Sequence, residues 1–232
     1  MKIRWIGQSG YVIKTAHVEI FIDPYLSDVV NRIANRPRLV KTPIIPSDIK
    51  ADVVVCTHDH LDHLDVDAIE EMDRDLFFAT TMEGSGKLKE MGFSRVKTLK
   101  VGDKIQVNDV EIQAVYAAHT VEAFGVLLRA EGKSLYFSGD TLYDEGLCEV
   151  ASHNPDITFI CINGKLGNMN VDEAVLMAKK IGAIVNVPNH YGMFASNTED
   201  PENFTKQIDN GFIMEFDLEY DLQDILQGVK GE

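Results

Sequence analysis

A run of seven residues carries three histidines and two aspartates directly behind a short apolar stretch. It reads Thr57-His58-Asp59-His60-Leu61-Asp62-His63 and follows Val53 to Cys56. Neutral imidazole nitrogens and carboxylate oxygens are the usual ligands of divalent zinc and manganese, and a loop can direct several of them to one point. A solvated polar turn is the alternative, but such a turn has no reason to repeat histidine at spacings of two and three. The run therefore predicts a metal-binding loop at the end of a buried strand.

Three further candidate ligands each follow a predicted strand: His119, Asp140 and His190. Strand ends that bring ligands to one rim are typical of a site carried on loops over a rigid scaffold. Taken singly, either histidine is more often structural, and Asp140 also fits a turn. We favour ligation for Asp140 because a carboxylate can bridge two cations through its two oxygens, which an imidazole cannot do.

Hydrophobic periodicity predicts many short strands and a few helices. Alternating or continuously apolar runs predict strands at residues 2–6, 11–14, 18–22, 51–57, 104–107, 110–115, 125–129, 134–137, 157–162 and 183–187. Helical spacing is expected over 66–72 after an Asp65 cap, and over 170–181 between Asn170 and Gly182. A further helix is expected from Asp200 and Pro201 through 208, and the proline-containing segment 26–50 is expected to be irregular.

Charge and composition narrow the classes of function. The formal net charge of −15 disfavours binding to nucleic acid. No stretch approaches a membrane span, and the start of the chain lacks a signal-peptide pattern, so a cytoplasmic protein without a membrane partner is expected. Its cysteines, Cys56, Cys148 and Cys161, are expected to be reduced. No linker or shift in composition divides the chain, which predicts one domain over residues 1–232.

The order of the candidate ligands, His-x-His-x-Asp-His followed by a distant His, Asp and His, resembles the metallo-β-lactamase superfamily of metal-dependent hydrolases. This resemblance implies an α/β fold of the four-layer αββα sandwich type and a centre with two metal ions. It implies one ion held by His58, His60 and His119, a second held by Asp62, His63 and His190, and a bridge between them by Asp140.

Residues 57–65, 162–169 and 188–194 are similar to the branch that contains the L-ascorbate-6-phosphate lactonases and related hydrolases. The expected activity is therefore hydrolysis of a small anionic, sugar-phosphate-like lactone. Two divalent ions, zinc or manganese before iron, would lower the pKa of a bound water to supply hydroxide and would polarise the carbonyl. Asp62 and Asp140 are the candidate catalytic residues, with Asp62 orienting the nucleophile. A phosphodiesterase on the same centre and a non-catalytic metal-binding protein are the alternatives.

Four other residues are candidates for supporting roles. Asp23 is expected to fix the tautomer of a ligand histidine, or else to be a turn residue before Pro24. Asn163 is expected to donate to the substrate or its oxyanion, or else to shape the loop before a helix. Arg36 and Arg38 lie in a locally basic segment of an acidic chain, and guanidinium groups recognise phosphate and carboxylate. They predict a lid over an anionic substrate, with a solvated loop as the alternative. The resemblance also suggests a homo-oligomer.

Overall fold

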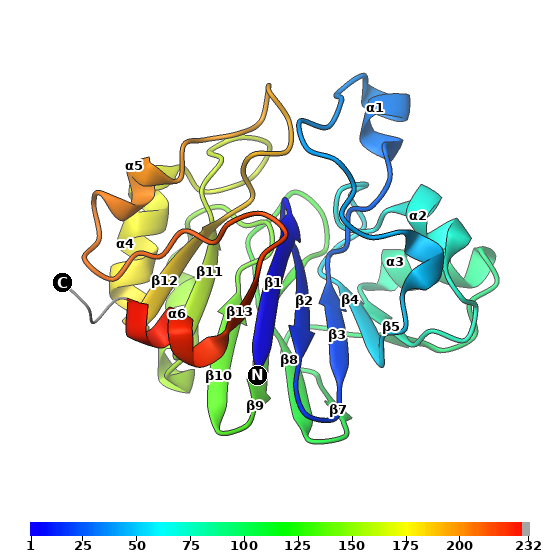
Figure 1. Ribbon diagram of the computed structural model, residues 1–232, viewed down its shortest axis with the longest axis horizontal. Helices are drawn as coiled ribbons and strands as arrows, with labels where there is room; N and C mark the ends of the chain where they lie inside the picture. The colour runs from blue at the N-terminus through cyan, green and yellow to red at the C-terminus, as the bar shows by residue number, and fades with distance from the viewer. Residues whose placement is uncertain (229–232) are drawn as a thin grey trace.

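Two β-sheets lie face to face in the computed structural model, which describes residues 1–228 (Figure 1). Along the first sheet the strands are β13 (Glu219–Asp221), β1 (Lys2–Gly7), β2 (Gly10–Lys14), β3 (Glu19–Ile22), β4 (Val53–Cys56), β5 (Phe78–Thr80) and β6 (Val96–Thr98). Along the second they are β12 (Val185–Asn189), β11 (Ile157–Cys161), β10 (Lys133–Phe137), β9 (Phe124–Ala130), β8 (Val110–Tyr116) and β7 (Lys104–Val107).

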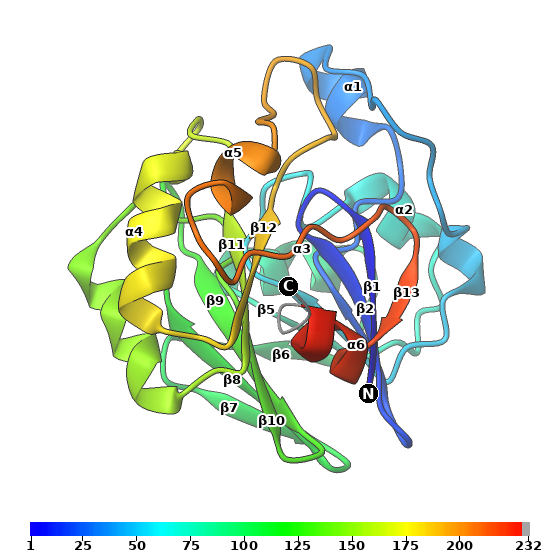
Figure 2. The same ribbon diagram turned by 60° about the vertical axis from the view of Figure 1, so that its left-hand side comes forward.

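Helices cover the outer face of each sheet (Figures 1 and 2). The first sheet is covered by α2 (Val66–Glu71) and α3 (Met82–Glu90), and the second by α4 (Val171–Ile181) with the 3₁₀ helix η2 (Glu145–His153) and the short α5 (Glu202–Thr205). The remaining helical segments are α1 (Val29–Ala34), η1 (Pro46–Asp48) and α6 (Leu222–Gly228). The layers follow the order helix, sheet, sheet, helix, so the expected αββα fold is confirmed.

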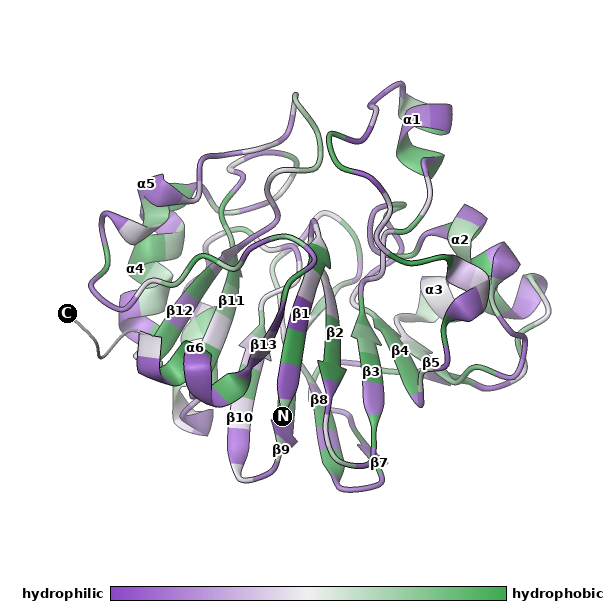
Figure 3. Cartoon of the chain, in the orientation of Figure 1, coloured by the Kyte–Doolittle hydropathy of each residue, from purple (hydrophilic) through white to green (hydrophobic). Residues whose placement is uncertain are grey.

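Strand β4 shows why the sequence before the histidine run is continuously apolar. Val53 and Val55 face the second sheet, while Val54 and Cys56 face the helices of the outer layer. All four are fully buried, because a strand with a layer on each side has no solvent face. Figure 3 shows β4 in the hydrophobic colour, whereas β1 and β10 alternate between hydrophobic and hydrophilic residues. The histidine run therefore begins where a rigid, doubly packed strand ends.

Most predicted elements are present, and α2 and α4 begin at their predicted caps. The Asp65 side chain accepts from the Ala68 amide, and Asn170 and Glu173 form a capping box at α4, which Gly182 ends. The helix predicted through residue 208 is wrong beyond Thr205, because the chain turns back there and the Phe212 amide bonds the Asn186 carbonyl. The segment 26–50 is not wholly irregular, since it contains α1 and η1.

Several elements were not predicted from the sequence: β5, β6, β13, α3, α6 and η2. Helix α3 carries two glycines, which are poor helix formers. Gly84 is required there, because a Cβ atom would lie 2.9 Å from a Leu64 methyl carbon and closer still to Thr80.

The three cysteines are free thiols, with Cys56 and Cys161 buried. None of the helices in residues 1–228 is both long and apolar enough to span a membrane.

Candidate metal centre

The candidate ligands lie at one edge of the sandwich because the strands that carry them end there. Strands β3, β4 and β5 are parallel to one another, as are β10, β11 and β12. Strand β8 also runs with β10, since each is antiparallel to β9. Residues that follow β4, β8, β10 and β12 therefore emerge at the same edge of the two sheets.

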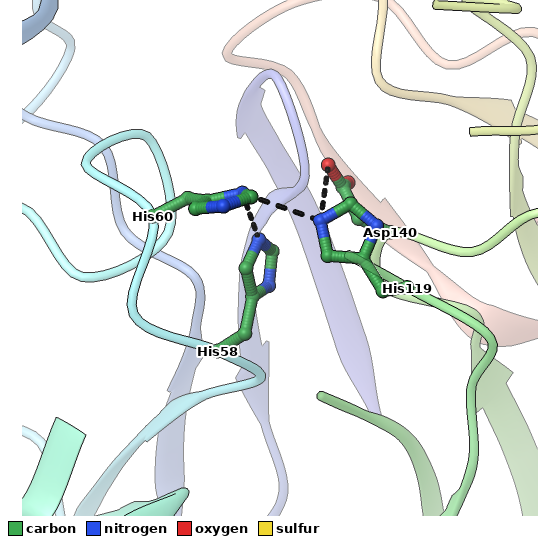
Figure 4. Close-up of side chains that lie close together, drawn as sticks. All are labelled: His58, His60, His119 and Asp140. Atoms are coloured by element: carbon green, nitrogen blue, oxygen red, sulfur yellow. Dashed lines mark hydrogen bonds and ion pairs between the residues drawn. The ribbon is translucent and has the colours of Figure 1, made fainter. Parts of the chain in front are cut away.

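Four side chains form what we call the first group: His58, His60, His119 and Asp140 (Figure 4). One ligand atom from each lies within 4.8 Å of the others. His60 Nδ1 is 3.0 Å from His58 Nε2 and 3.2 Å from His119 Nε2, and Asp140 Oδ2 is 4.0 Å from His119 Nε2. The imidazoles thus point their nitrogens at a common centre.

Asp62, His63 and His190 form the second group, again with one ligand atom each within 4.8 Å of the others. Asp140 joins the two groups, because its Oδ1 lies 3.1 Å from both His63 Nε2 and His190 Nε2 while its Oδ2 faces the first group. The structure therefore brings all seven sequence-predicted ligands together and places Asp140 between the two sets.

The spacing and chemistry of these atoms fit a divalent cation. Ligand atoms about 2.0–2.2 Å from a tetrahedral zinc lie roughly 3.3–3.6 Å from one another, close to the shorter separations in both groups. Two buried atoms, His63 Nε2 and Asp140 Oδ1, lie 3.1 Å apart, but neither makes a well-aligned hydrogen bond to the other or to any other described residue. Buried polar atoms are normally paired, and a cation between the groups would satisfy both. An all-nitrogen-and-oxygen donor set suits zinc, manganese or iron.

Histidine pKa values shift in opposite directions in the two groups. Burial lowers the pKa values of His58 and His119, so both are neutral and able to coordinate. Burial alone would lower the pKa of His190 as well, but the carboxylates of Asp140 and Asp62 raise it to about 9. The pKa of His63 is also raised well above its usual value: burial opposes the charged form, but the carboxylates of Asp140, Asp23 and Asp62 outweigh it. Without an ion both histidines of the second group therefore hold a proton at neutral pH, and a cation must displace these protons.

The carboxylate of Asp23 contacts Nδ1 of His63, the ring nitrogen that does not face the second group. Its Oδ2 is 2.8 Å from His63 Nδ1, and it accepts hydrogen bonds of 2.7 Å from both the amide and the hydroxyl of Thr57. With Nδ1 engaged by this carboxylate, Nε2 of His63 is left facing the second group. This is the contact that fixing the tautomer of His63 would need, and that role of Asp23 stays a prediction.

His119 is oriented by the loop that follows β11. Its Nδ1 lies 3.0 Å from the Gly167 carbonyl oxygen, and a Cβ atom on Gly167 would lie 3.0 Å from the same ring. Asn163 holds this loop: its Nδ2 donates to Asn197 and to the Lys165 carbonyl, and its Oδ1 accepts from Asn168. Because its donors and its acceptor are engaged within the loop, Asn163 shapes this loop and has no free N–H group to donate to a substrate.

Two residues at the site were not predicted from the sequence. Gln8, in the turn between β1 and β2, is fully buried against Asp62 and His190. Lys87 of α3 binds the Asp59 carboxylate at 2.6 Å and so ties the histidine run to that helix. The available signal for Gln8 was its position in a Gly-Gln-Ser-Gly turn at the rim where the ligands emerge.

Comparison with known proteins gives the family. The profile of the beta-lactamase superfamily domain matches residues 19–191. A UPF0173 metal-dependent hydrolase of Oenococcus oeni is 30% identical over 241 residues, which cover 95% of this chain and 100% of that protein. The chain belongs to the beta-lactamase superfamily, among its UPF0173 metal-dependent hydrolases. The superfamily inferred from the ligand order is thereby confirmed.

Solved structures show the same fold. This hydrolase matches Igni18, a metallo hydrolase from Ignicoccus hospitalis, with a TM-score of 0.78 and 22% identity over 95% of this chain and 98% of that one. An isothiocyanate hydrolase from Delia radicum gut bacteria matches with a TM-score of 0.80 and 19% identity, covering 96% of this chain and 99% of that one. At these identities the likeness concerns the fold alone.

A pocket of about 610 Å³ opens beside the metal centre of the hydrolase and reaches both groups through His60 and Asp62. Arg36 lines it, and within residues 1–228 its guanidinium makes no ion pair or hydrogen bond with another side chain. Arg38 lies elsewhere: it donates to the carbonyls of Tyr25, Ser27 and Val40 and stacks on the Tyr25 ring. Of the two arginines expected to contact substrate, only Arg36 lines the pocket, because backbone carbonyls hold the other.

Proposed function

We propose that this metal-dependent hydrolase is a lactonase that opens a small anionic lactone and holds two divalent cations, zinc or manganese. The observation that carries the proposal is the Arg36 guanidinium in the pocket that also contains His60 and Asp62. A free guanidinium beside a hydrolytic centre is suited to a carboxylate or phosphate on the substrate.

The chain's own residues divide the chemistry among them. Two divalent ions, when bound, would polarise a carbonyl and supply a nucleophile from water at neutral pH. Asp140 joins the two groups, because one of its oxygens faces His63 and His190 and the other faces His119. Asp62 belongs to the second group and also lines the pocket, so its carboxylate can accept a hydrogen bond from the attacking water and orient it beside the substrate.

The pocket walls fit the rest of such a substrate. Val30, Leu61, Val121 and Leu166 supply aliphatic contacts that suit the carbon skeleton of a small ring. Lys87 also lines the pocket, but its ammonium group is engaged by Asp59. Arg36 is therefore the cation best placed to hold an anionic substituent.

The test compares two lactones that share a ring and differ only in one carboxylate or phosphate group. After loading with zinc or manganese and measurement of the metal content, we expect Arg36→Ala to raise KM for the anionic lactone about tenfold and to leave kcat nearly unchanged, because a charged hydrogen bond is lost. KM for the neutral lactone should not change. Arg32→Ala is the matched control, since Arg32 lies on the same segment but pairs with Asp67 outside the pocket.

Absence of hydrolysis of every lactone by the fully loaded protein would reject the lactonase. A phosphodiester and a thioester belong in the same panel, with Asp62→Ala as the inactive control. Arg36 would equally suit a phosphodiester, so turnover of that substrate alone would establish the phosphodiesterase instead.

A further inference from the structure

Gln8 occupies the second group although glutamine is not among the usual ligands of these ions. It lies in the turn from β1 to β2 with a backbone φ of +54° and no exposed surface. Its carbonyl accepts from the Trp5 indole at 2.9 Å and from the His190 amide at 3.3 Å. The backbone of the turn is therefore hydrogen-bonded to the end of β12, which fixes the position from which the Gln8 side chain extends.

The Gln8 amide contacts two of the three members of the second group. Nε2 donates to Asp62 Oδ2 at 2.7 Å and lies against the edge of the His190 ring, 3.1 Å from its Nε2 and 3.3 Å from its Nδ1. Its other end, Oε1, is buried and has no hydrogen-bond partner among the described residues. A side chain held only for packing would not need an amide here, because burial of a half-satisfied amide costs free energy.

Gln8 donates to the Asp62 oxygen that faces the other two members of the second group. Asp62 Oδ2 lies 3.5 Å from His190 Nε2 and 3.9 Å from His63 Nε2, so it is the oxygen directed at the other members. Asp62 sits on a loop, and its shortest hydrogen bond is the 2.7 Å bond that it accepts from Gln8, beside a longer contact of 3.5 Å with His190 Nε2. Loss of that bond would free the carboxylate to turn.

We propose that Gln8 is a positioning residue that sets the affinity of the second group for its ion by holding Asp62 Oδ2 toward His63 and His190. This inference rests on the proposed pair of ions. Partners that orient a metal ligand typically change metal affinity by about 10- to 100-fold when they are removed, and we expect a loss of that size for one of the two ions.

Two variants remove the contact by different routes. Gln8→Asn keeps the amide but withdraws it by one carbon, and asparagine tolerates the left-handed backbone of this turn, so folding should be preserved. Gln8→Met keeps the length and removes the donor. Gln113→Asn is the matched control, because it makes the same chemical change on β8, where Gln113 contacts Arg129 rather than a ligand.

Each protein is stripped of metal, and zinc is titrated in competition with a chromophoric chelator while thermal unfolding is followed with and without zinc. We expect the wild type and Gln113→Asn to bind two ions tightly. Both Gln8 variants should keep one tight ion, bind the second about 10- to 100-fold more weakly, and unfold near the wild-type temperature when zinc is absent.

Wild-type affinity for both ions in either Gln8 variant would overturn the role of Gln8 and leave the pair of ions standing. If the wild type itself binds one ion, the proposed pair is wrong. Gln8 is then judged on that single ion: lower affinity in both variants supports its role, and unchanged affinity refutes it.

Discussion

Replacing Asp23 by asparagine tests how the chain prepares His63 for a cation. The aspartate accepts three hydrogen bonds, with Oδ1 serving the Thr57 amide and Oδ2 serving the Thr57 hydroxyl and His63 Nδ1. Asparagine has nearly the same shape but offers one oxygen, and its amide group must face one of these partners. The two orientations have different consequences.

If the asparagine oxygen faces His63, its amide opposes the Thr57 N–H and leaves that buried donor unsatisfied, at a cost of about 1–3 kcal/mol. If the amide faces His63 instead, Nδ1 must accept, and the ring proton moves to Nε2, the atom that faces the second group. A protonated Nε2 cannot coordinate. The ion-free protein can adopt the second orientation, whereas the loaded protein must adopt the first and bear its cost.

The difference appears as lost affinity of the second group. A cost of about 1–3 kcal/mol corresponds to about 5- to 150-fold in the dissociation constant. Competition titration with zinc should show this loss for one ion, with the other unaffected. Asp52→Asn is the control: Asp52 accepts from the Glu19 amide at the opposite end of β3 and β4. If Asp23→Asn binds both ions as tightly as the wild type, Asp23 does not set the tautomer of His63.

Three further predictions concern protons and folding. Without an ion His190 has a pKa raised to about 9 and His63 has a pKa raised well above its usual value. Zinc must displace a proton from each, so the affinity of the second group should rise between pH 6 and 8 by about tenfold per pH unit for each proton displaced. A pH-independent affinity over that range would contradict the assignment. Protonated His190 also stabilises the ion-free protein. This contribution is complete below about pH 6.5 and is lost as the pH rises through about 9, which thermal unfolding in a chelator will detect. Asn170→Ala removes the capping box of α4 and should cost about 1 kcal/mol in chemical denaturation, with zinc affinity unchanged; a coupled loss of zinc affinity would show that the cap also supports the loop at His119.

The sequence predicted those parts of the fold that local periodicity determines. The apolar run from Val53 to Cys56 could be assigned as doubly buried because such strands lack a polar face, and Asn170 with Glu173 marks a helix start by side-chain chemistry alone. The clustering of the candidate ligands was predictable for a related reason: histidine and aspartate directly after buried strands have few uses other than at a shared rim.

The unpredicted features depend on contacts between distant segments. Helix α3 is stable despite its glycines because Gly84 lets it approach Thr80 and Leu64 closely, which no local pattern records. Arg36 and Arg38 are two residues apart with the same side chain, yet only the second has backbone carbonyls within reach. Which arginine stays available for a substrate is a property of the folded loop.

Three of the nine non-glycine residues with a positive φ in the described part of the chain lie in the second group or against it. Gln8, Asp23 and His190 have φ values of +54°, +44° and +61°, and each lies in the group or touches a member of it. A non-glycine residue in this region costs of order 1 kcal/mol and persists only when surrounding contacts enforce it. The enforcing contacts are backbone bonds, from the Asp23 amide to Val55 and from the His190 amide to Gln8. Glycine would relieve the strain at each position but would remove the side chain, and these three side chains are the ones that form or contact the site of the proposed second ion.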